Sequence, residues 1–147
     1  MYDHIDYHTE EDYPVDLPES RAATHMGFYW AWAVSQNLHN SGWEDAAAED
    51  MAALKTGSLS GAGFILKNMG GELDENDFSP LGQRFSAFYY EDEEEGYGAF
   101  MEDYVTTMNT PELPSFYHVA DTQENQHKLN AVFQAAFDRW QASLKPA

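Results

Sequence analysis

The stretch GFYWAWAV, residues 27–34, constrains the fold more than any other part of the chain, because it packs four large aromatic rings into eight positions. The apolar run from Met26 to Val34 is nine residues long and is followed by polar side chains. A membrane-spanning helix needs about 20 apolar residues, so this run is too short to cross a bilayer. Apolar residues at helical spacing predict a helix over residues 20–38 that is apolar on most faces. Such a helix is expected at the centre of a soluble domain.

The same spacing predicts five more helices, over residues 43–55, 60–68, 79–90, 97–108 and 121–145. Ser79 is expected to cap the fourth helix, with Pro80 at its first position. Asp121 is expected to cap the last helix, with Glu124 in the capping-box position. Gly42 is the expected left-handed terminator of the first helix. The segment SFYHV at 115–119 is the one strand-like run.

These patterns predict an all-α fold in a single compact domain, residues 1–147, with about six helices. A chain of 147 residues suits one domain. Residues 1–19 contain seven acids, no Lys or Arg, and two prolines, so we expect an extended acidic arm. It should dock on the helical body, residues 20–145, through scattered apolar side chains: Ile5, Tyr7, Tyr13 and Leu17.

The net charge indicates which classes of partner the chain can bind. There are 26 acidic and 7 basic residues, a formal net charge of -19. Nucleic acid and anionic membranes repel such a chain, whereas a basic protein is attracted to it. Cysteine is absent, which excludes disulfides and thiolate sites. The acidic N-terminus lacks the basic and apolar regions of a secretory leader, so a cytoplasmic location is expected.

No motif in the chain predicts a catalytic residue, a cofactor or a metal ion. His4 and His8 have the spacing of two metal ligands on a helix, but their segment does not look helical, so a solvated arm is the preferred interpretation. Neither acidic stretch, from Asp74 or from Asp92, satisfies the calcium-loop pattern. His25 is interpreted as a core histidine bonded to an acid or a carbonyl. A two-carboxylate hydrolase remains an alternative, which a raised carboxyl pKa beside His25 would support.

The densest acidic cluster is the predicted contact site. Five consecutive acids between two predicted helices could simply be a solvated surface, or they could bind a basic partner. We expect the centre of the contact to contain Glu91, Asp92, Glu93, Glu94, Glu95 and Tyr97, with Glu102 and Asp103 at its edge. Tyrosine is enriched at interface hot spots, so Tyr97 and Tyr90 are the candidate aromatic anchors. The acidic loop at 71–77 is the rival site.

Several motifs resemble a family of small acidic bacterial immunity proteins that accompany secreted or polymorphic toxins. The motifs are THMGFYWAWAV, FYYED…YGAFMEDY, LPSFYHVADTQEN and a last helix ending in RW, and they extend from Tyr2 to Trp140. The segment LKTGSLSGAGFIL departs from the family pattern. The matching positions are Thr24, His25, Gly27, Trp32, Tyr90, Asp103, Tyr104, Pro114, Tyr117, Asp121 and Asn125.

The resemblance implies an immunity protein that binds and neutralises a cognate antibacterial toxin acting in the cytosol on nucleic acid or nucleotides. The acidic surface would then imitate an anionic substrate at a basic active site. Two alternatives remain. One is a DNA-mimic inhibitor of an endogenous nucleic-acid-binding protein, and the other is the carboxylate-dependent hydrolase.

Overall fold

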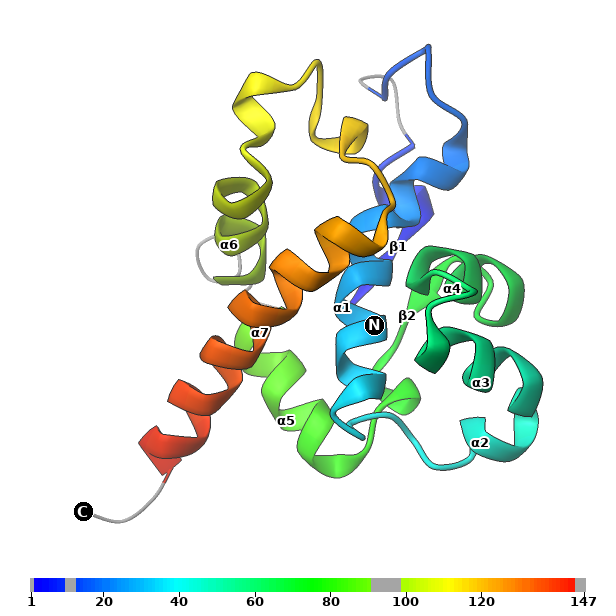
Figure 1. The fold of residues 1–147 in the computed structure, drawn as a ribbon, viewed down its shortest axis with the longest axis vertical. Coiled ribbons are helices and arrows are strands. Elements are labelled where there is room, and N and C mark those ends of the chain that lie inside the picture. Colours follow the sequence, from blue (N-terminus) through cyan, green and yellow to red (C-terminus); the bar gives the residue numbers. More distant parts are fainter. Residues whose placement is uncertain (1, 10–12, 91–98, 145–147) are drawn as a thin grey trace.

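Helix α1 (Thr24–Ser35) runs through the middle of the molecule, with the other helices arranged around it (Figure 1). The computed structural model describes residues 2–9, 13–90 and 99–144. Ten of the 12 residues of α1 are buried, including all four rings of the GFYWAWAV stretch. The prediction that this stretch forms the core is therefore confirmed. No helix in the described part of the chain combines the length and the apolar character needed to span a bilayer.

Two groups of helices cover opposite sides of α1. On one side lie α5 (Pro80–Tyr89), α6 (Ala99–Met108) and α7 (Gln123–Leu144), with α7 packed against α1, α5 and α6. On the other side lie α2 (Trp43–Ala46), α3 (Ala48–Thr56) and α4 (Gly61–Asn68) (Figure 1). Short 3-10 helices occupy Ile5–Tyr7, Glu19–Ala23, Glu75–Asp77, Thr110–Glu112 and Phe116–His118. The predicted all-α fold is confirmed, with seven α-helices over residues 2–9, 13–90 and 99–144 in place of about six.

Helices α1 and α4 approach each other so closely that only glycine fits at their contact. A Cβ atom on Gly27 would lie 2.1 Å from the backbone nitrogen of Ala62, and one on Gly61 would lie 1.8 Å from the carbonyl oxygen of Gly27. The absence of both side chains allows the two backbones to touch. This contact holds α4 against the centre of the fold.

Helix boundaries follow local capping chemistry, although not always at the predicted residue. The Ser79 hydroxyl accepts a hydrogen bond from the Gly82 N–H at the start of α5, as predicted. Helix α1 ends at Ser35, and the left-handed residue just beyond it is Asn37, whose φ is 59°, whereas Gly42 has an ordinary φ of -59°. The prediction for Gly42 is therefore wrong, because asparagine tolerates the left-handed region. Helix α7 is capped by the Thr122 hydroxyl, which accepts from the Asn125 N–H, and not by Asp121.

Tertiary contacts overrode two other local predictions. The single helix expected over 43–55 is broken at Ala47, whose φ of -140° separates α2 from α3. The Trp43 ring packs edge-on against Trp30 and Phe64, and this packing fixes α2 separately from α3. The strand-like segment 115–119 contains a 3-10 helix instead.

The N-terminal arm docks through backbone pairing. Strand β1 (Asp3–His4) pairs antiparallel with β2 (Glu72–Leu73), with Asp3 opposite Leu73. The Tyr2 N–H also donates to the Leu73 carbonyl. Ile5 packs against the core, whereas Tyr7 is 61% exposed, so the arm docks at fewer of its apolar residues than predicted. The pairing places Asp3 in the interior.

Candidate functional site

The predicted contact segment is only partly covered by the structure. Glu91–Glu95 and Tyr97 lie outside the described residues. Glu102 on α6 is exposed, whereas Asp103 is half-buried and its Oδ2 accepts a 2.6 Å hydrogen bond from the Tyr89 hydroxyl. The Tyr90 hydroxyl donates to Asp3 in the interior, so Tyr90 is not a surface anchor. Glu102 is the described member of the set that is free for a contact.

An aromatic groove lies where α5, α6 and α7 meet. In sequence, α5 precedes the predicted contact segment and α6 follows it. It has a volume of about 260 Å³, and Phe88, Asp103, Arg139 and Trp140 are among its lining residues. Phe88 is 58% exposed, and its ring lies 6.3 Å from that of the nearly buried Trp140. The helical spacing of Leu81, Phe85 and Phe88 predicts that all three face the core, and the exposure of Phe88 shows that this prediction is wrong for Phe88. The groove offers an exposed aromatic side chain that sequence reasoning missed.

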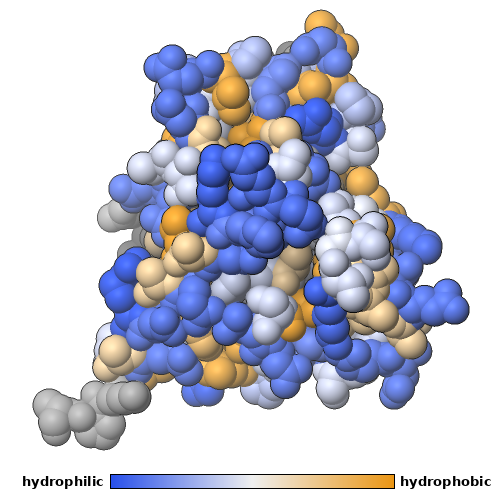
Figure 2. Space-filling model, in the orientation of Figure 1, coloured by the Kyte–Doolittle hydropathy of each residue, from blue (hydrophilic) through white to orange (hydrophobic). Residues whose placement is uncertain are grey.

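Few of the described carboxylates are neutralised by lysine. Lysine ion pairs in the described part of the chain involve three acids, Glu44, Asp50 and Glu124. Other exposed acids, among them Asp45, Glu49 and Glu75, form no ion pair within the described residues. One face of the molecule is mostly hydrophilic, with small and separate hydrophobic areas (Figure 2). The surface therefore keeps most of the negative charge that the composition implies.

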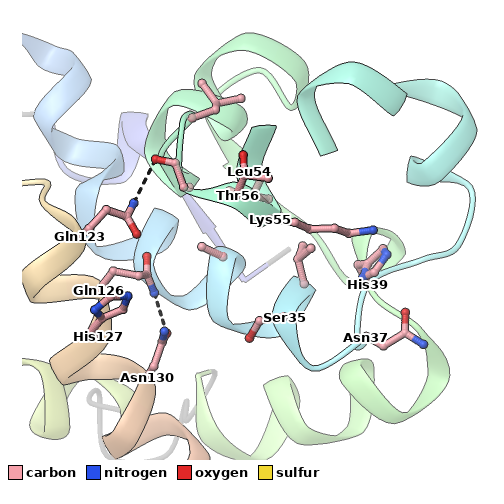
Figure 3. Close-up of a pocket in the computed structure, with 15 residues that line it drawn as sticks. Ser35, Asn37, His39, Leu54, Lys55, Thr56, Gln123, Gln126, His127 and Asn130 are labelled. Atoms are coloured by element: carbon pink, nitrogen blue, oxygen red, sulfur yellow. Dashed lines mark hydrogen bonds between the residues drawn. The ribbon is translucent and has the colours of Figure 1, made fainter. Parts of the chain in front are cut away.

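A larger groove, of about 540 Å³, lies between α7 and the end of α3, with α1 as its floor. Gln123, Gln126, His127 and Asn130 of α7 line one wall, and Lys55 and His39 stand on the other side (Figure 3). None of its lining residues is an Asp or Glu. Most of the polar groups that it presents are amides and hydroxyls, so we call it the amide groove.

The side chains of the amide groove are largely bonded to the protein itself. The His39 Nε2 and the Lys55 Nζ both contact the same Glu44 oxygen, so both side chains are already engaged within the protein. The Ser35 hydroxyl donates to the Trp32 carbonyl within its own helix. The Gln126 amide donates to the Phe28 carbonyl and to Asn130. Among the residues of this groove, no hydroxyl is paired with a base in the manner that nucleophilic catalysis requires.

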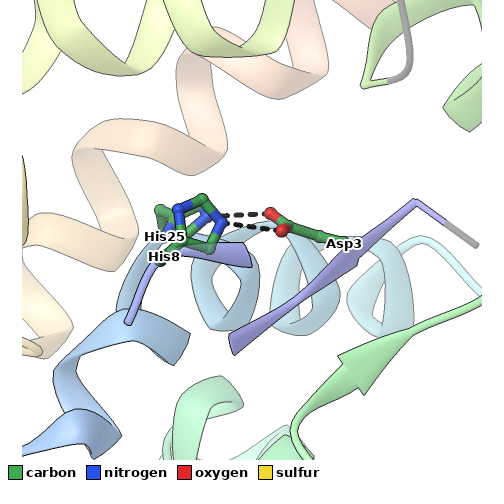
Figure 4. A group of neighbouring side chains, drawn as sticks. All are labelled: Asp3, His8 and His25. Atoms are coloured by element: carbon green, nitrogen blue, oxygen red, sulfur yellow. Dashed lines mark hydrogen bonds and ion pairs between the residues drawn. The ribbon is translucent and has the colours of Figure 1, made fainter. Parts of the chain in front are cut away.

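The third candidate is a buried cluster of one acid and two histidines, Asp3, His8 and His25, which we call the Asp3 cluster (Figure 4). The His8 Nε2 lies 2.7 Å from Asp3 Oδ1, and the His25 Nε2 lies 2.9 Å from Asp3 Oδ2. The three possible ligand atoms lie within 4.8 Å of one another. Strand pairing presents Asp3, the short helix Ile5–Tyr7 turns the chain back to present His8, and α1 supplies His25.

Two tyrosine hydroxyls also form hydrogen bonds with the Asp3 cluster. The Tyr90 hydroxyl donates to Asp3 Oδ2 at 2.5 Å, and the Tyr117 hydroxyl lies 2.7 Å from the His8 Nδ1. Burial and the adjacent Asp3 charge raise the pKa of Tyr90 well above its usual value, so its hydroxyl keeps its proton. Burial also raises the pKa of Tyr117 to about 12. Both tyrosines therefore remain neutral, and each forms a hydrogen bond with a member of the Asp3 cluster.

The ionisation of the Asp3 cluster follows from burial and hydrogen bonding. Burial opposes the charge of Asp3, but His25 and His8 overcome it and hold the carboxyl pKa below its usual range. Burial lowers the pKa of His25, against the opposing pull of Asp3. At neutral pH the pair is therefore a carboxylate and a neutral imidazole. The His25 Nδ1 is buried and has no hydrogen-bond partner among the described residues.

The Asp3 cluster corrects one interpretation, confirms another and bears on a third. The prediction that His25 is a core histidine bonded to an acid is confirmed. The solvated-arm interpretation is wrong for His8, whose side chain is 15% exposed and bonded at both ring nitrogens. The carboxylate beside His25 has a lowered pKa, whereas the hydrolase alternative called for a raised one. No spacing in the sequence links Asp3 to His25, because a strand pairing brings them together.

Comparison with known proteins identifies a family but no function. No curated protein matches the chain, and no solved structure matches it. The model of one protein family, described as Domain of unknown function (DUF7832), matches residues 1–119. This match includes every residue of the Asp3 cluster and both of its tyrosine partners. The chain therefore belongs to the DUF7832 family.

Proposed function

We propose that this protein is an immunity protein that binds and neutralises a cognate antibacterial toxin. The observation that carries the proposal is the net charge of -19, which lysine pairing relieves at only three acids of the described part of the chain. A toxin that acts on nucleic acid or nucleotides needs a basic active site to bind an anionic substrate. A surface rich in unpaired carboxylates imitates that substrate and can occupy the site.

The aromatic groove supports a specific place for the proposed contact with the toxin. Charges at the rim of an interface mainly set the association rate, whereas buried aromatic side chains hold the complex together. Phe88 is exposed on α5, three positions before the acidic segment Glu91–Glu95 in sequence. Glu102, exposed on α6, lies on the other side of that segment in sequence. We therefore place Phe88 in the contact as its apolar anchor, in the role first assigned to Tyr90.

The first experiment tests the acidic segment in a growth assay. Candidate toxins from the same genome are co-expressed with the protein, and survival of the cells is measured. The triple variant Asp92→Ser, Glu93→Ser, Glu94→Ser is expected to lose protection. The matched control, Asp45→Ser, Glu49→Ser, Glu75→Ser, makes the same change in charge at exposed acids of the described surface and should keep it. Full protection by the first triple variant, at normal expression, would refute this contact site.

A second experiment tests the aromatic anchor. Phe88→Ala should weaken the purified complex by about 2 kcal/mol, as expected for an interface hot spot. Leu66→Ala, at an apolar residue of α4 that is 36% exposed, is the matched control and should bind normally. The association rate should also fall steeply with added salt, because like-charged surface clusters act through a screened field. A rate that is independent of salt would mean that the acids serve only solubility.

The identity of the bound protein separates this proposal from the DNA-mimic alternative. Both depend on the same negative charge. Affinity purification from the native host, followed by mass spectrometry, distinguishes them. A toxin among the specifically bound proteins supports immunity, whereas an endogenous nucleic-acid-binding protein supports mimicry.

A further inference from the structure

The Asp3 cluster has a second possible role that the partner-binding proposal does not use. A carboxylate and two imidazole nitrogens, from three separate segments, converge in the interior of the protein. We propose that Asp3, His8 and His25 form a binding site for one divalent transition-metal ion of the zinc class. This inference is independent of the proposed toxin binding.

The donor atoms are already close to the separation that a zinc site requires. Zinc binds imidazole nitrogen and carboxylate oxygen at about 2.0–2.2 Å, which places neighbouring ligands of a tetrahedral site about 3.3 Å apart. The two nitrogen–oxygen distances are 2.7 and 2.9 Å, and all three donor atoms lie within 4.8 Å of one another. The 2.7 Å distance is to Asp3 Oδ1 and the 2.9 Å distance is to Asp3 Oδ2. Each of these pairs must open by about half an ångström to admit the ion, and the two imidazole nitrogens, which lie at most 4.8 Å apart, must settle at about 3.3 Å from each other. Asp3 and His8 belong to the N-terminal segment, which can make these shifts without moving α1.

The chemistry of the donors favours zinc over calcium or magnesium. Two imidazoles with one carboxylate suit zinc and its first-row neighbours, whereas hard cations prefer sites made of oxygen alone. A metal ion requires neutral imidazole and ionised carboxylate. The ion would take the position of the hydrogens that now link the imidazoles to the carboxylate.

The outer hydrogen bonds resemble those that orient metal ligands. Ligating imidazoles usually bond through their second nitrogen, and ligating carboxylates accept an additional hydrogen bond. The His8 Nδ1 bonds to the Tyr117 hydroxyl, and Asp3 accepts from the Tyr90 hydroxyl. In the described part of the chain the His25 Nδ1 has no partner, and on that side its ring packs against Phe116 and Tyr104. Two of the three ligands therefore already have outer partners.

The ion can reach the cluster from the side of His8. The His8 side chain is 15% exposed, compared with 1% for His25, and Tyr117 beside it is half-buried. Three protein ligands leave a fourth position for water. The large negative charge of the protein also raises the local concentration of cations. Bound metal would tie the N-terminal segment to α1.

The experiment measures metal binding to the full chain after treatment with a chelator and dialysis. Co²⁺ is titrated as a spectroscopic substitute for Zn²⁺, and histidine ring signals are followed by NMR. We expect one ion per chain, with shifts in His8 and His25 and none in the other four of the six histidines. His8→Gln should reduce the affinity by more than about tenfold, and Tyr117→Phe by about tenfold. Excess Ca²⁺ should not displace the ion.

Two controls separate this site from loose binding to surface acids. His127→Gln, at an exposed histidine of α7, and Glu102→Gln, at an exposed acid of α6, should leave the affinity unchanged. His8 is at the edge of the cluster, so its variant should fold even if variants of the buried His25 do not. Equal affinity in His8→Gln, displacement by Ca²⁺, or no binding at all would overturn the proposal. In those cases the cluster is a hydrogen-bonded attachment of the N-terminal segment alone.

Discussion

Replacing Gly27 with Ala should be among the most destabilising single-methyl changes in this protein. The new Cβ would lie 2.1 Å from the Ala62 nitrogen and 2.6 Å from the Ala62 Cα. An ordinary contact begins at 3.4 Å, so the backbones must separate by 3.4 minus 2.1, or 1.3 Å. Both atoms belong to a helix backbone, and no side-chain rotation can relieve the overlap.

Separating the two backbones would also weaken the other contacts between α1 and α4, and this loss sets the size of the destabilisation. Trp30 and Phe64 face each other across it, with ring centroids 5.8 Å apart. A gap of about 1 Å removes up to half of the dispersion energy of each atom pair that it separates. Overpacking in a core costs about 1–3 kcal/mol, and this rigid contact belongs at the upper end. We expect Gly27→Ala to lower the free energy of unfolding by about 3 kcal/mol.

Urea denaturation followed by tryptophan fluorescence measures this loss. With an m value of about 2 kcal/mol per molar, the midpoint should fall by about 1.5 M. Gly63→Ala is the matched control within α4, because its Cβ would meet side-chain atoms and no backbone: the flexible end of Leu59 at 2.9 Å and the Ser60 Oγ at 3.3 Å. The gain in helix propensity of about 1 kcal/mol should offset these contacts. Equal midpoints for the two variants would refute the proposed backbone contact.

Three further predictions concern the core, a helix cap and a buried acid. Trp32→Ala should cost about 3–5 kcal/mol by cavity formation, because Trp32 is 1% exposed; a thermal melt close to that of the wild type would place the ring on a surface. Ser79→Ala should cost about 1 kcal/mol in urea unfolding through loss of the cap of α5, whereas Ser79→Asp should keep the stability. Burial, together with Asp74 and Glu72, raises the pKa of Asp77 from 3.8 to about 6. Folding therefore favours the protonated form of Asp77. The free energy of unfolding is expected to fall as the pH rises from 3.8 to about 6. Asp77→Asn should therefore stabilise the protein at pH 7 by about 1 kcal/mol, after allowance for partial exposure, and a gain that persists at pH 3 would contradict this cause.

Local interactions made much of the helical structure predictable from the sequence. The apolar residues that recur along α7 define its buried stripe, which includes Leu129, Phe133 and Phe137. The Ser79–Pro80 pair marks the start of α5. Both signals arise from residues three or four positions apart, so they depend little on the rest of the fold. The aromatic stretch 27–34 had to be central because no exposed helix carries so many rings.

Contacts between segments that are far apart in sequence determined the features that the sequence did not predict. Phe88 and Tyr89 are adjacent on α5, and the orientation of that helix against α6 and α7 buries Tyr89, bonded to Asp103, while it exposes Phe88. Two-residue strands such as β1 are too short to produce a periodic signal. The His8 ring and the Tyr117 hydroxyl are 109 positions apart in the chain, yet they share a hydrogen bond. The sequence by itself determined the helices, the core ring cluster and the negative charge, because these depend on neighbouring residues and on composition. The tertiary structure alone decided that Asp3, His8 and His25 meet, because no local interaction relates a strand, a loop and a helix.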